Sequence, residues 1–402
     1  MQGFPPQGGY GYGVPPQQIP PGYAQQPMQP MGYPQNPYPQ KVMPGMVQPA
    51  YAQQQYQNPY PQKVMPGMVQ PAYAQQQYQN PMAAYTYQTY GSNINLTQID
   101  QDCHALRKAM KGLGTDEDLI ISILTNRNNE QRYMIKQRYK TLLNRDLIKD
   151  LKSELHGNFE DAVLALLDSP YELDCRGLYH AMHRPGTDEE ALIEILGTRP
   201  SYQLAQDKIL FQQLYGKDLY NYVHSETSGH FRQILLALLN CQRHDFSYPI
   251  NQQELQMEAQ QLYQGGAARW GTNESVFTRI FTTRSPAEIA VIAQLYQKIA
   301  GVDLYTSLKK EFSGSAEKAL VGIFYASINT PEYFATRVRD AVKGLGTKDT
   351  NLIRIIVSRA EYDMPQIKQA YKNLYNRDMV TDVQNDTHGD YKKILTALMN
   401  KK

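Results

Sequence analysis

Four short loops along the chain end in a Gly-Thr pair, and each of these threonines is followed 39 positions later by an acidic residue. The threonines are Thr115, Thr187, Thr272 and Thr347, and the acids are Glu154, Glu226, Glu311 and Asp386. Calcium is bound by oxygen atoms, and a sharply bent loop can supply backbone carbonyls that a carboxylate completes. The constant spacing therefore predicts calcium sites, each built from one loop and one distant acid.

The glycines explain how such a loop holds a cation. Gly112 and Gly114 in the first loop tolerate backbone angles that other residues avoid, so neighbouring carbonyls can converge. Three carbonyls and a bidentate carboxylate leave calcium short of its roughly six to eight oxygens. Water or a lipid phosphate can fill the open positions. The predicted ion therefore bridges the loop to an anionic membrane.

A pair of helix caps or an EF-hand could also contain such glycines. A single loop of this kind is more often a helix C-cap followed by an N-cap, but four loops with matched acids favour metal binding. No Asp-x-Asp-x-Asp-Gly loop is present, which excludes an EF-hand. Thr115 with Asp118 still predicts a capping box at the next helix, and Asn129 is predicted to cap the helix after it.

Charge divides the chain into two parts. Residues 1–92 contain Lys41, Lys63 and no acidic residue, whereas the remainder has 38 basic and 38 acidic residues. This balance gives no electrostatic case for nucleic-acid binding. No apolar run approaches the roughly 18 residues that a membrane-spanning helix needs, so membrane contact is expected to be peripheral.

The N-terminus and the cysteines predict a cytoplasmic protein that associates reversibly with membranes. Residues 1–6 lack the charged and apolar regions of a secretion signal. The three cysteines are widely spaced and are expected to be free thiols, which favours a reducing compartment; they are Cys103, Cys175 and Cys241.

Residues 1–92 are predicted to be a disordered tail rich in Pro, Gln, Tyr and Gly, with polyproline II character. Residues 36–57 and 58–79 are identical copies, a tandem duplication. The tail is either a passive spacer or a multivalent segment that binds proline-reading partners or associates through tyrosines. These tyrosines include Tyr10, Tyr12, Tyr23, Tyr33, Tyr38 and Tyr51.

The rest of the chain predicts an all-α fold of four repeats with about five helices each. Apolar residues fall at helical spacing in short blocks, and strand signals are missing. The expected repeats are 93–168, 169–242, 243–328 (with a linker) and 329–402. An arginine follows each threonine by twelve positions and is interpreted as structural, bonding helix carbonyls or an acid in the repeat; these are Arg127, Arg199, Arg284 and Arg359.

These residues carry a family resemblance. Residues 106–115, Leu-Arg-Lys-Ala-Met-Lys-Gly-Leu-Gly-Thr, with Arg145-Asp146-Leu and Asp150-Leu-Lys-Ser-Glu154, resemble the first repeat of an annexin. The likeness covers about residues 93–402 and all four repeats. It implies a slightly curved all-α disc that carries Ca²⁺ on its convex face and docks reversibly on phosphatidylserine-type membranes.

The resemblance also implies the calcium ligands, which are loop carbonyls and the acids. They fall on Met110, Gly112, Gly114 and Glu154; on Met182, Arg184, Gly186 and Glu226; on Ala267, Arg269, Gly271 and Glu311; and on Val342, Gly344, Gly346 and Asp386. The second repeat departs from the pattern, because Arg184 and Pro185 replace the usual Gly-x. Whether that repeat binds calcium stays open.

Trp270 is the only tryptophan and is expected at the tip of the third loop. An indole has an apolar body and a polar N–H, which suits the lipid headgroup boundary. Trp270 is therefore predicted to touch the membrane. The other expected contacts are Lys111, Leu113, Lys343 and Leu345.

The leading functional hypothesis is calcium-dependent binding to anionic phospholipids. The tail resembles that of the synexin-like, long-tailed annexins, which implies vesicle aggregation, membrane trafficking or repair, self-association, and penta-EF-hand or other proline-reading partners. A tail-driven scaffold is an alternative. An enzyme is not expected, because the histidines form no plausible metal-binding pair and no nucleophile elbow occurs.

A further alternative is a calcium-dependent ion-conducting protein. By resemblance, four residues match the polar side chains that line the central axis of annexins; they are Asp174, Glu194, Arg199 and Arg354. The favoured interpretation is a buried ion-pair cluster that orders the repeats, because buried charges need partners.

Overall fold

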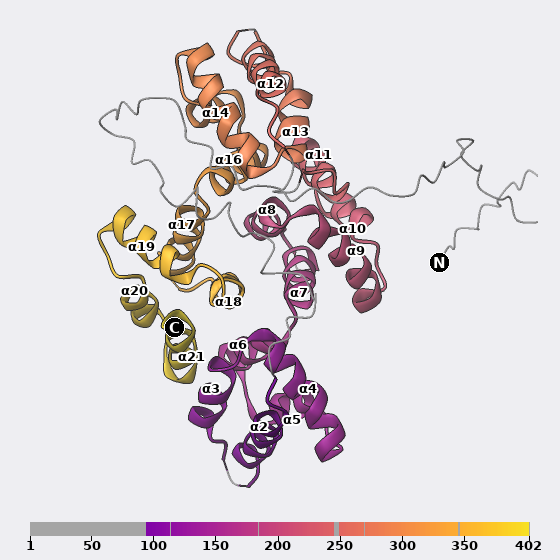
Figure 1. The fold of residues 1–402 in the computed structure, drawn as a ribbon, viewed down its shortest axis with the longest axis vertical. Coiled ribbons are helices and arrows are strands. Elements are labelled where there is room, and N and C mark those ends of the chain that lie inside the picture. The colour runs from indigo at the N-terminus through magenta and orange to yellow at the C-terminus, as the bar shows by residue number, and fades with distance from the viewer. Residues whose placement is uncertain are drawn as a thin grey trace, which may run out of the picture. The chain divides into compact units, whose positions relative to one another are not determined.

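The computed structural model describes residues 94–112, 114–183, 185–244, 249–268, 270–344 and 346–401. These residues form twenty α-helices and no β-strand (Figure 1), which confirms the all-α prediction. The predictions for residues 1–92, including the two copies at 36–57 and 58–79, lie outside the described residues.

The helices form four groups of five in the same order. The first group is α2 (Leu96–Ala109), α3 (Glu117–Thr125), α4 (Asn129–Leu143), α5 (Leu147–Glu154) and α6 (Gly157–Leu167). The second is α7 (Pro170–His183), α8 (Glu189–Thr198), α9 (Ser201–Tyr215), α10 (Leu219–Glu226) and α11 (Gly229–Leu239). The third is α12 (Gln252–Gly265), α13 (Glu274–Thr283), α14 (Pro286–Ala300), α15 (Leu304–Glu311) and α16 (Gly314–Ile328). The fourth is α17 (Thr330–Val342), α18 (Asp349–Arg359), α19 (Met364–Tyr375), α20 (Met379–Asp386) and α21 (Gly389–Met399).

The caps differ from the sequence prediction by one residue. Asp116, not Thr115, caps α3, because its side chain accepts a hydrogen bond from the backbone N–H of Leu119. Asn128, not Asn129, caps α4 and forms a capping box with Gln131. An aspartate that follows the threonine competes for the same capping position, and it leaves the threonine hydroxyl available to another partner.

The hydrophobic interior consists of two clusters of buried side chains. One cluster joins the first and fourth groups and includes Tyr139 and Tyr371, both fully buried. The other joins the second and third groups and includes Phe211, Phe277 and Phe281. Within each group the first helix packs on the third, as α2 does on α4 and α12 on α14. Pairing the groups covers apolar helix faces that a single five-helix group would expose.

The predicted central polar residues form two buried ion pairs. Glu194 on α8 accepts two hydrogen bonds, of 2.9 and 2.8 Å, from Arg354 on α18, and thus joins helices of the two clusters. Arg199 donates two bonds of 2.8 Å to Asp174. Although burial disfavours its charge, the nearby Arg354 lowers the pKa of Glu194. All four residues are therefore engaged in pairing, as the ion-pair interpretation expects.

The four repeated arginines pack against acids, which agrees with the structural interpretation. Arg127 bonds Asp102, Arg199 bonds Asp174, and Arg284 bonds Glu258. The fourth repeat pairs its arginine with an acid at a different position. Phe334 stands where the other repeats place an acid, and Arg359 lies over its ring at 4.4 Å while it bonds Asp363.

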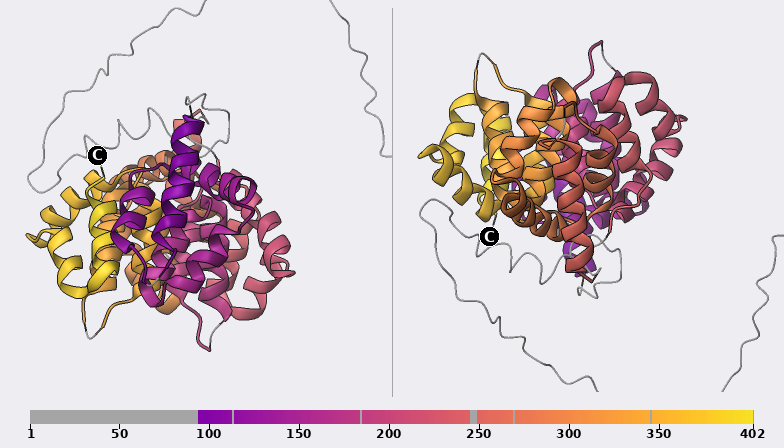
Figure 2. Two further views of the ribbon diagram at one scale, coloured as in Figure 1. Left: turned by 90° about the horizontal axis from the view of Figure 1, so that it is seen from below. Right: turned by 90° about the horizontal axis from the view of Figure 1, so that it is seen from above.

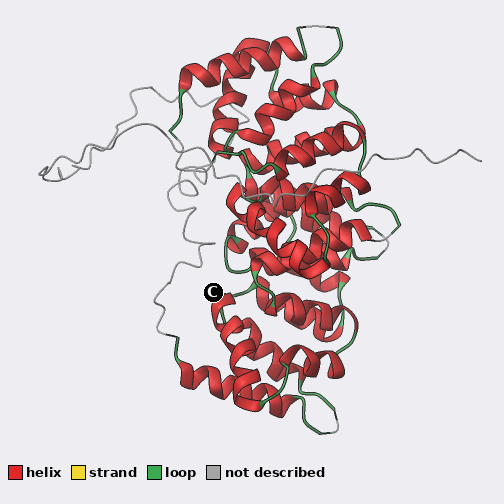
Figure 3. Cartoon of the chain, turned by 90° about the vertical axis from the view of Figure 1, so that its right-hand side faces the viewer, coloured by secondary structure: helices red, strands yellow, loops and turns green. Residues whose placement is uncertain are grey.

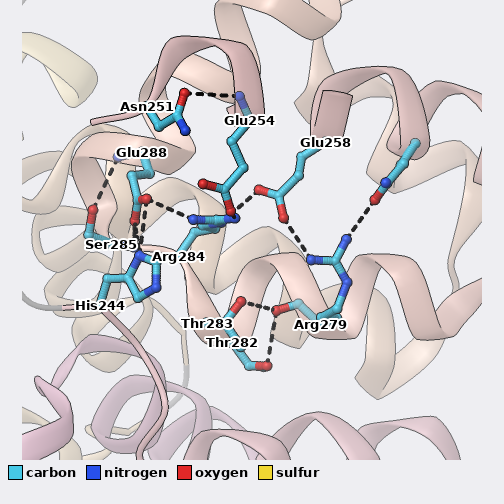
Figure 4. A network of polar contacts seen from close by, with 11 residues as sticks. His244, Asn251, Glu254, Glu258, Arg279, Thr282, Thr283, Arg284, Ser285 and Glu288 are labelled. Atoms are coloured by element: carbon cyan, nitrogen blue, oxygen red, sulfur yellow. Dashed lines mark hydrogen bonds and ion pairs between the residues drawn. The ribbon is translucent and has the colours of Figure 1, made fainter. Parts of the chain in front are cut away.

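The arginine of the third repeat is the centre of a larger network (Figure 4). Arg284 contacts three carboxylates, those of Glu254, Glu258 and Glu288. His244 lies 3.0 Å from Glu288, and its backbone N–H donates to the carbonyl of Thr283. Because His244 precedes the third repeat in the chain, these contacts fasten the connecting segment to that repeat.

The three cysteines carry free thiols, as the sequence predicts. Cys103 and Cys175 are buried free thiols, and Cys241 is a partly buried one. Among the described helices, none has the length and apolarity that a bilayer crossing requires.

Candidate metal centres

Each Gly-Thr loop is closed by a backbone hydrogen bond from the residue after the threonine to the end of the preceding helix. In three repeats this bond spans seven residues, as in Asp116 N–H to the carbonyl of Ala109 at 2.9 Å. In the third repeat it runs from Asn273 to Gly265 at 2.7 Å and spans eight. The third loop is therefore one residue longer, which counting backward from the threonine did not show.

The glycines adopt the angles that the sequence led us to expect. The last glycine of each loop has φ between 78° and 85°, a region that side chains other than glycine rarely adopt; these are Gly114, Gly186, Gly271 and Gly346. Gly112 and Gly344, the earlier glycines, have φ of 119° and 129°. The turns therefore depend on glycine in the first and fourth loops at two positions each.

The threonine hydroxyl holds the distant acid against the loop. The hydroxyl of Thr115 donates to the carboxylate of Glu154 at 3.1 Å. The same bond is 2.6 Å between Thr272 and Glu311 and 2.6 Å between Thr347 and Asp386. In these three repeats the contact joins the threonine to the acid that follows it by 39 positions. It brings together the loop and the acid of three of the four predicted sites.

The second repeat lacks this contact. Thr187 donates to the backbone carbonyl of Glu226 at 3.0 Å, and the Glu226 carboxylate accepts a bond of 3.3 Å from Ser225 instead. The loop that departs from the sequence pattern is thus also the one whose acid is not held by its threonine.

The predicted ligands are otherwise placed as follows. Met110 and Met182 are buried, and the ligand that the sequence predicts from each of them is its backbone carbonyl. Four predicted residues, Leu113, Arg184, Arg269 and Leu345, lie outside the described residues. No cluster of three or more His, Cys, Asp or Glu side chains suited to a metal occurs in the described part of the chain. One carboxylate with several backbone carbonyls is an oxygen-only donor set, which fits calcium and does not suit a transition metal.

A second layer of side chains positions the acid-bearing helix in the first repeat. Asp150 lies one helical turn before Glu154 on α5 and accepts two bonds of 2.7 Å from Arg145 and one of 2.7 Å from Tyr139. The hydrogen bond from Arg145 lowers the pKa of Asp150, so this carboxylate stays charged. The arrangement anchors α5 beneath the loop.

In the first repeat Arg107 also lies 3.7 Å from Asp150, and the fourth repeat has the same arrangement of four residues. Asp382 precedes Asp386 by one turn and accepts bonds from Arg377, Arg339 and Tyr371. The sequence pattern did not lead us to predict this layer. The sequence feature that could have indicated it is the full set of matching Arg, Tyr and Asp positions, which only the first and fourth repeats share.

The second repeat replaces this ionic arrangement by aromatic contacts. Tyr179 stacks on Tyr215 at 4.1 Å and on His183 at 4.5 Å, and Lys217 lies over the ring of Tyr222 at 4.0 Å. Tyr179 and Tyr222 occupy the positions that Arg107 and Asp150 hold in the first repeat. The support beneath the second loop is therefore chemically different.

The loops between the first and second helices of the groups project from one side of the helices (Figures 2 and 3). Trp270 in the third loop is 98% exposed, which confirms the expected loop-tip position. Lys111 and Lys343 are exposed on the first and fourth loops. One apolar ring and two cations are thus presented on the loop-bearing side.

Comparison with known proteins decides the family. The profile of the annexin family matches four ranges, 101–166, 173–238, 257–323 and 333–398. The chain belongs to the annexin family. It is 43% identical to human annexin A7 over 299 residues, which span 74% of this chain and 61% of that protein.

Solved annexin structures share the fold. Annexin III matches with a TM-score of 0.73 and 38% identity over 75% of this chain and 93% of its own. A calcium-bound annexin (Sm)1 matches with a TM-score of 0.69 and 31% identity over 75% of this chain and 90% of its own. The family is known for calcium-dependent phospholipid binding rather than for enzymatic activity.

The threonine contact leads to a matched pair of variants. Thr347→Val removes the donor to Asp386 and is expected to raise the calcium concentration needed for half-maximal vesicle binding by about tenfold, the lower end of the effect of losing a partner of a metal ligand. Thr187→Val, whose hydroxyl donates only to a backbone carbonyl, is expected to change it much less. Equal shifts in the two calcium titrations would contradict this role for the threonine.

Proposed function

We propose that this annexin binds anionic phospholipid membranes through calcium ions held by its loops. The supporting observation is the threonine–carboxylate bond, which in three repeats holds an acid beside a glycine loop. The proposed ligands are the carbonyls and acids at Met110, Gly112, Gly114 and Glu154; Ala267, Arg269, Gly271 and Glu311; and Val342, Gly344, Gly346 and Asp386.

Calcium would link the protein to the lipid by charge. Each site carries one formal negative charge, so a bound divalent ion leaves it electropositive, and its open coordination positions accept a lipid phosphate oxygen. Such a site is weak by itself and strong beside an anionic headgroup. Met182, Arg184, Gly186 and Glu226 would form a weaker fourth site, because Glu226 is not held by Thr187.

Trp270 would enter the headgroup region when calcium draws the loops to the membrane. A side chain that is 98% exposed keeps its contact with water in the folded protein, and it gains apolar contact when the loop docks on a membrane. Lys111 and Lys343 would meet lipid phosphates, with Leu113 and Leu345 beside them. These five residues are the proposed membrane contacts.

We also propose a cytoplasmic protein whose residues 1–92 recruit partners, self-associate or aggregate vesicles. The support is compositional, since this segment is rich in Pro, Tyr and Gln and almost free of charge. Penta-EF-hand or other proline-reading proteins are the partners that the resemblance to long-tailed annexins suggests.

The test is co-sedimentation of the full chain with phosphatidylserine-containing or purely zwitterionic vesicles, with and without calcium. Binding is expected only with calcium and the anionic lipid. Because Trp270 is the only tryptophan, its fluorescence emission is expected to shift to shorter wavelength in the same samples. Absence of calcium-dependent binding would mean that the loops are helix caps and nothing more.

A shortened chain separates the two parts of the proposal. Deletion of residues 1–92 is expected to abolish vesicle clustering, measured by turbidity, while calcium-dependent co-sedimentation is retained. Clustering that survives the deletion would assign it to the helical repeats and contradict the role of the tail.

A further inference from the structure

Asp207 is a fully buried carboxyl with no hydrogen-bond partner for either oxygen among the described residues. It lies on α9, which packs against α7 inside the second hydrophobic cluster. A buried carboxylate without a partner is strongly unfavourable, and such groups usually pair or become neutral. The function proposed above makes no use of this residue.

The other repeats show that the fold does not require a carboxyl at this position. The position lies twenty residues after the repeat threonine, and it is occupied by Ile135, Ile292 and Ile367 in the other three repeats. All three isoleucines are buried. Asp207 thus replaces an apolar core residue, and its acid is a property of the second repeat alone.

A neighbouring amide supplies a second unpaired acceptor. The side-chain nitrogen of Gln203 donates to the Asp174 carboxylate at 2.6 Å, and this bond fixes the orientation of the amide. Its oxygen, Oε1, is buried and has no donor in the described structure. Gln203 precedes Asp207 by one helical turn on α9, so the two side chains are neighbours on the helix surface.

The charged and titratable groups that face Asp207 within the described ranges include one cation, and it is already paired. Asp174 and Cys175 face Asp207 from α7, Arg199 from the end of α8, and Cys241 from beyond α11. Arg199 donates from two guanidinium nitrogens to the Asp174 carboxylate, so its charge is already paired. Burial raises the pKa of both Cys175 and Cys241, so these thiols stay neutral. Three buried side-chain oxygens, Gln203 Oε1 and both carboxyl oxygens of Asp207, thus have no donor in the described structure.

We propose that Asp207 holds a proton in the folded protein at neutral pH, and that its neutral carboxyl is the donor that Gln203 Oε1 lacks. One proton then removes a buried charge next to Asp174 and gives an orphan oxygen a partner. The second repeat contains a proton-binding site on which the packing of α9 against α7 depends. Loss of the proton places two adjacent negative charges in the core.

The electrostatics agree with this arrangement. Burial first, and then the charge of Asp174, raise the pKa of Asp207 to about 9, while Arg199 lowers it in part. An unfolded aspartate has a pKa of about 3.9. The folded state therefore keeps a proton that the unfolded state releases. Between these two values, stability falls as pH rises.

The consequence is a pH-sensitive second repeat. α7 ends at His183, directly before the loop of the second candidate calcium site. A rise in pH that removes the proton weakens the packing of α9 against α7, the helix that leads into this loop. The other three repeats have isoleucine at the position of Asp207 and are not affected in this way. Rising pH is thus expected to loosen the second repeat before the others.

The test uses the full chain and the variants Asp207→Asn and Asp207→Ile, the second of which copies the other repeats. Urea unfolding is measured from about pH 5 to about pH 10, on either side of the pKa of Asp207 in the folded chain. The folding equilibrium constant of the wild type, divided by that of either variant, is expected to fall about tenfold per pH unit, as release of one proton on unfolding requires. Near pH 9 the ratio should level off.

Infrared difference spectra give a direct readout of the proton. At neutral pH the wild type is expected to show the carbonyl stretch of a protonated carboxyl that both variants lack, and this band should disappear as the pH is raised. Parallel stability curves for the wild type and both variants would overturn the proposal. A wild-type spectrum without the extra band would overturn it as well, whether or not a single variant fails to fold.

Discussion

Replacing Glu194 by glutamine is expected to lower the free energy of unfolding by about 3–5 kcal/mol, the range for breaking a buried ion pair by removing one partner. Glu194 is fully buried, and its two bonds to Arg354 join helices from the two hydrophobic clusters. Glutamine keeps the shape but leaves the guanidinium charge of Arg354 without a counter-charge. Urea unfolding at neutral pH measures the loss.

The matched control removes both charges together. Glu194→Leu combined with Arg354→Met is expected to recover most of the stability, because apolar pairs of similar volume often equal or exceed a buried ion pair. The double variant should also keep calcium-dependent vesicle binding. If Glu194→Gln alone left stability unchanged, the pair would not be structural, and the ion-conducting alternative would regain its main residues.

Much of the fold could be predicted from the sequence, because the signals repeat. Helical spacing of apolar residues, one Gly-Thr loop and one arginine twelve positions later occur in every repeat, and repetition separates a structural requirement from chance. The ion pairs at Arg127, Arg199 and Arg284 follow from this pattern. The pairing of the first repeat with the fourth did not follow, because local patterns do not say which apolar faces meet.

The errors in the site have local causes. Thr115 looks like a helix cap, but Asp116 is the better placed acceptor and takes that role. The extra residue of the third loop lies upstream of Thr272, where counting from the threonine could not reveal it. The Arg, Tyr and Asp arrangement around Asp150 was missed because it recurs in only one other repeat. Such contacts become visible only when the helices are packed.

Asp207 illustrates a different limit of sequence reasoning. An aspartate within a helix is ordinarily taken as exposed, since charged residues are seldom buried without partners. Alignment of the repeat positions against Ile135, Ile292 and Ile367 is what exposes it as a core residue. Departures between repeats of one chain therefore carry information that each repeat by itself does not.

Neutralising the three acids held by loop threonines is expected to weaken calcium-dependent vesicle binding severely. The combined variant is Glu154→Gln, Glu311→Gln and Asp386→Asn, and it leaves the glycine loops and the helices intact. Each of the three sites then has no formal negative charge to offset calcium, whose affinity depends on ligand charge. The calcium concentration for half-maximal co-sedimentation is expected to rise by more than about 100-fold, beyond the loss that follows when only a hydrogen-bond partner of a metal ligand is removed.

Glu226→Gln is the matched control, because its carboxylate is bonded to Ser225 rather than to Thr187. It is expected to shift the calcium titration by less than about threefold, because this carboxylate is not held beside its loop by the threonine and therefore contributes less to binding an ion there. A shift as large as that of Glu154→Gln alone would show that the threonine contact does not distinguish calcium sites from the second loop. Retained binding in the triple variant would instead place the membrane-binding calcium away from these loops altogether.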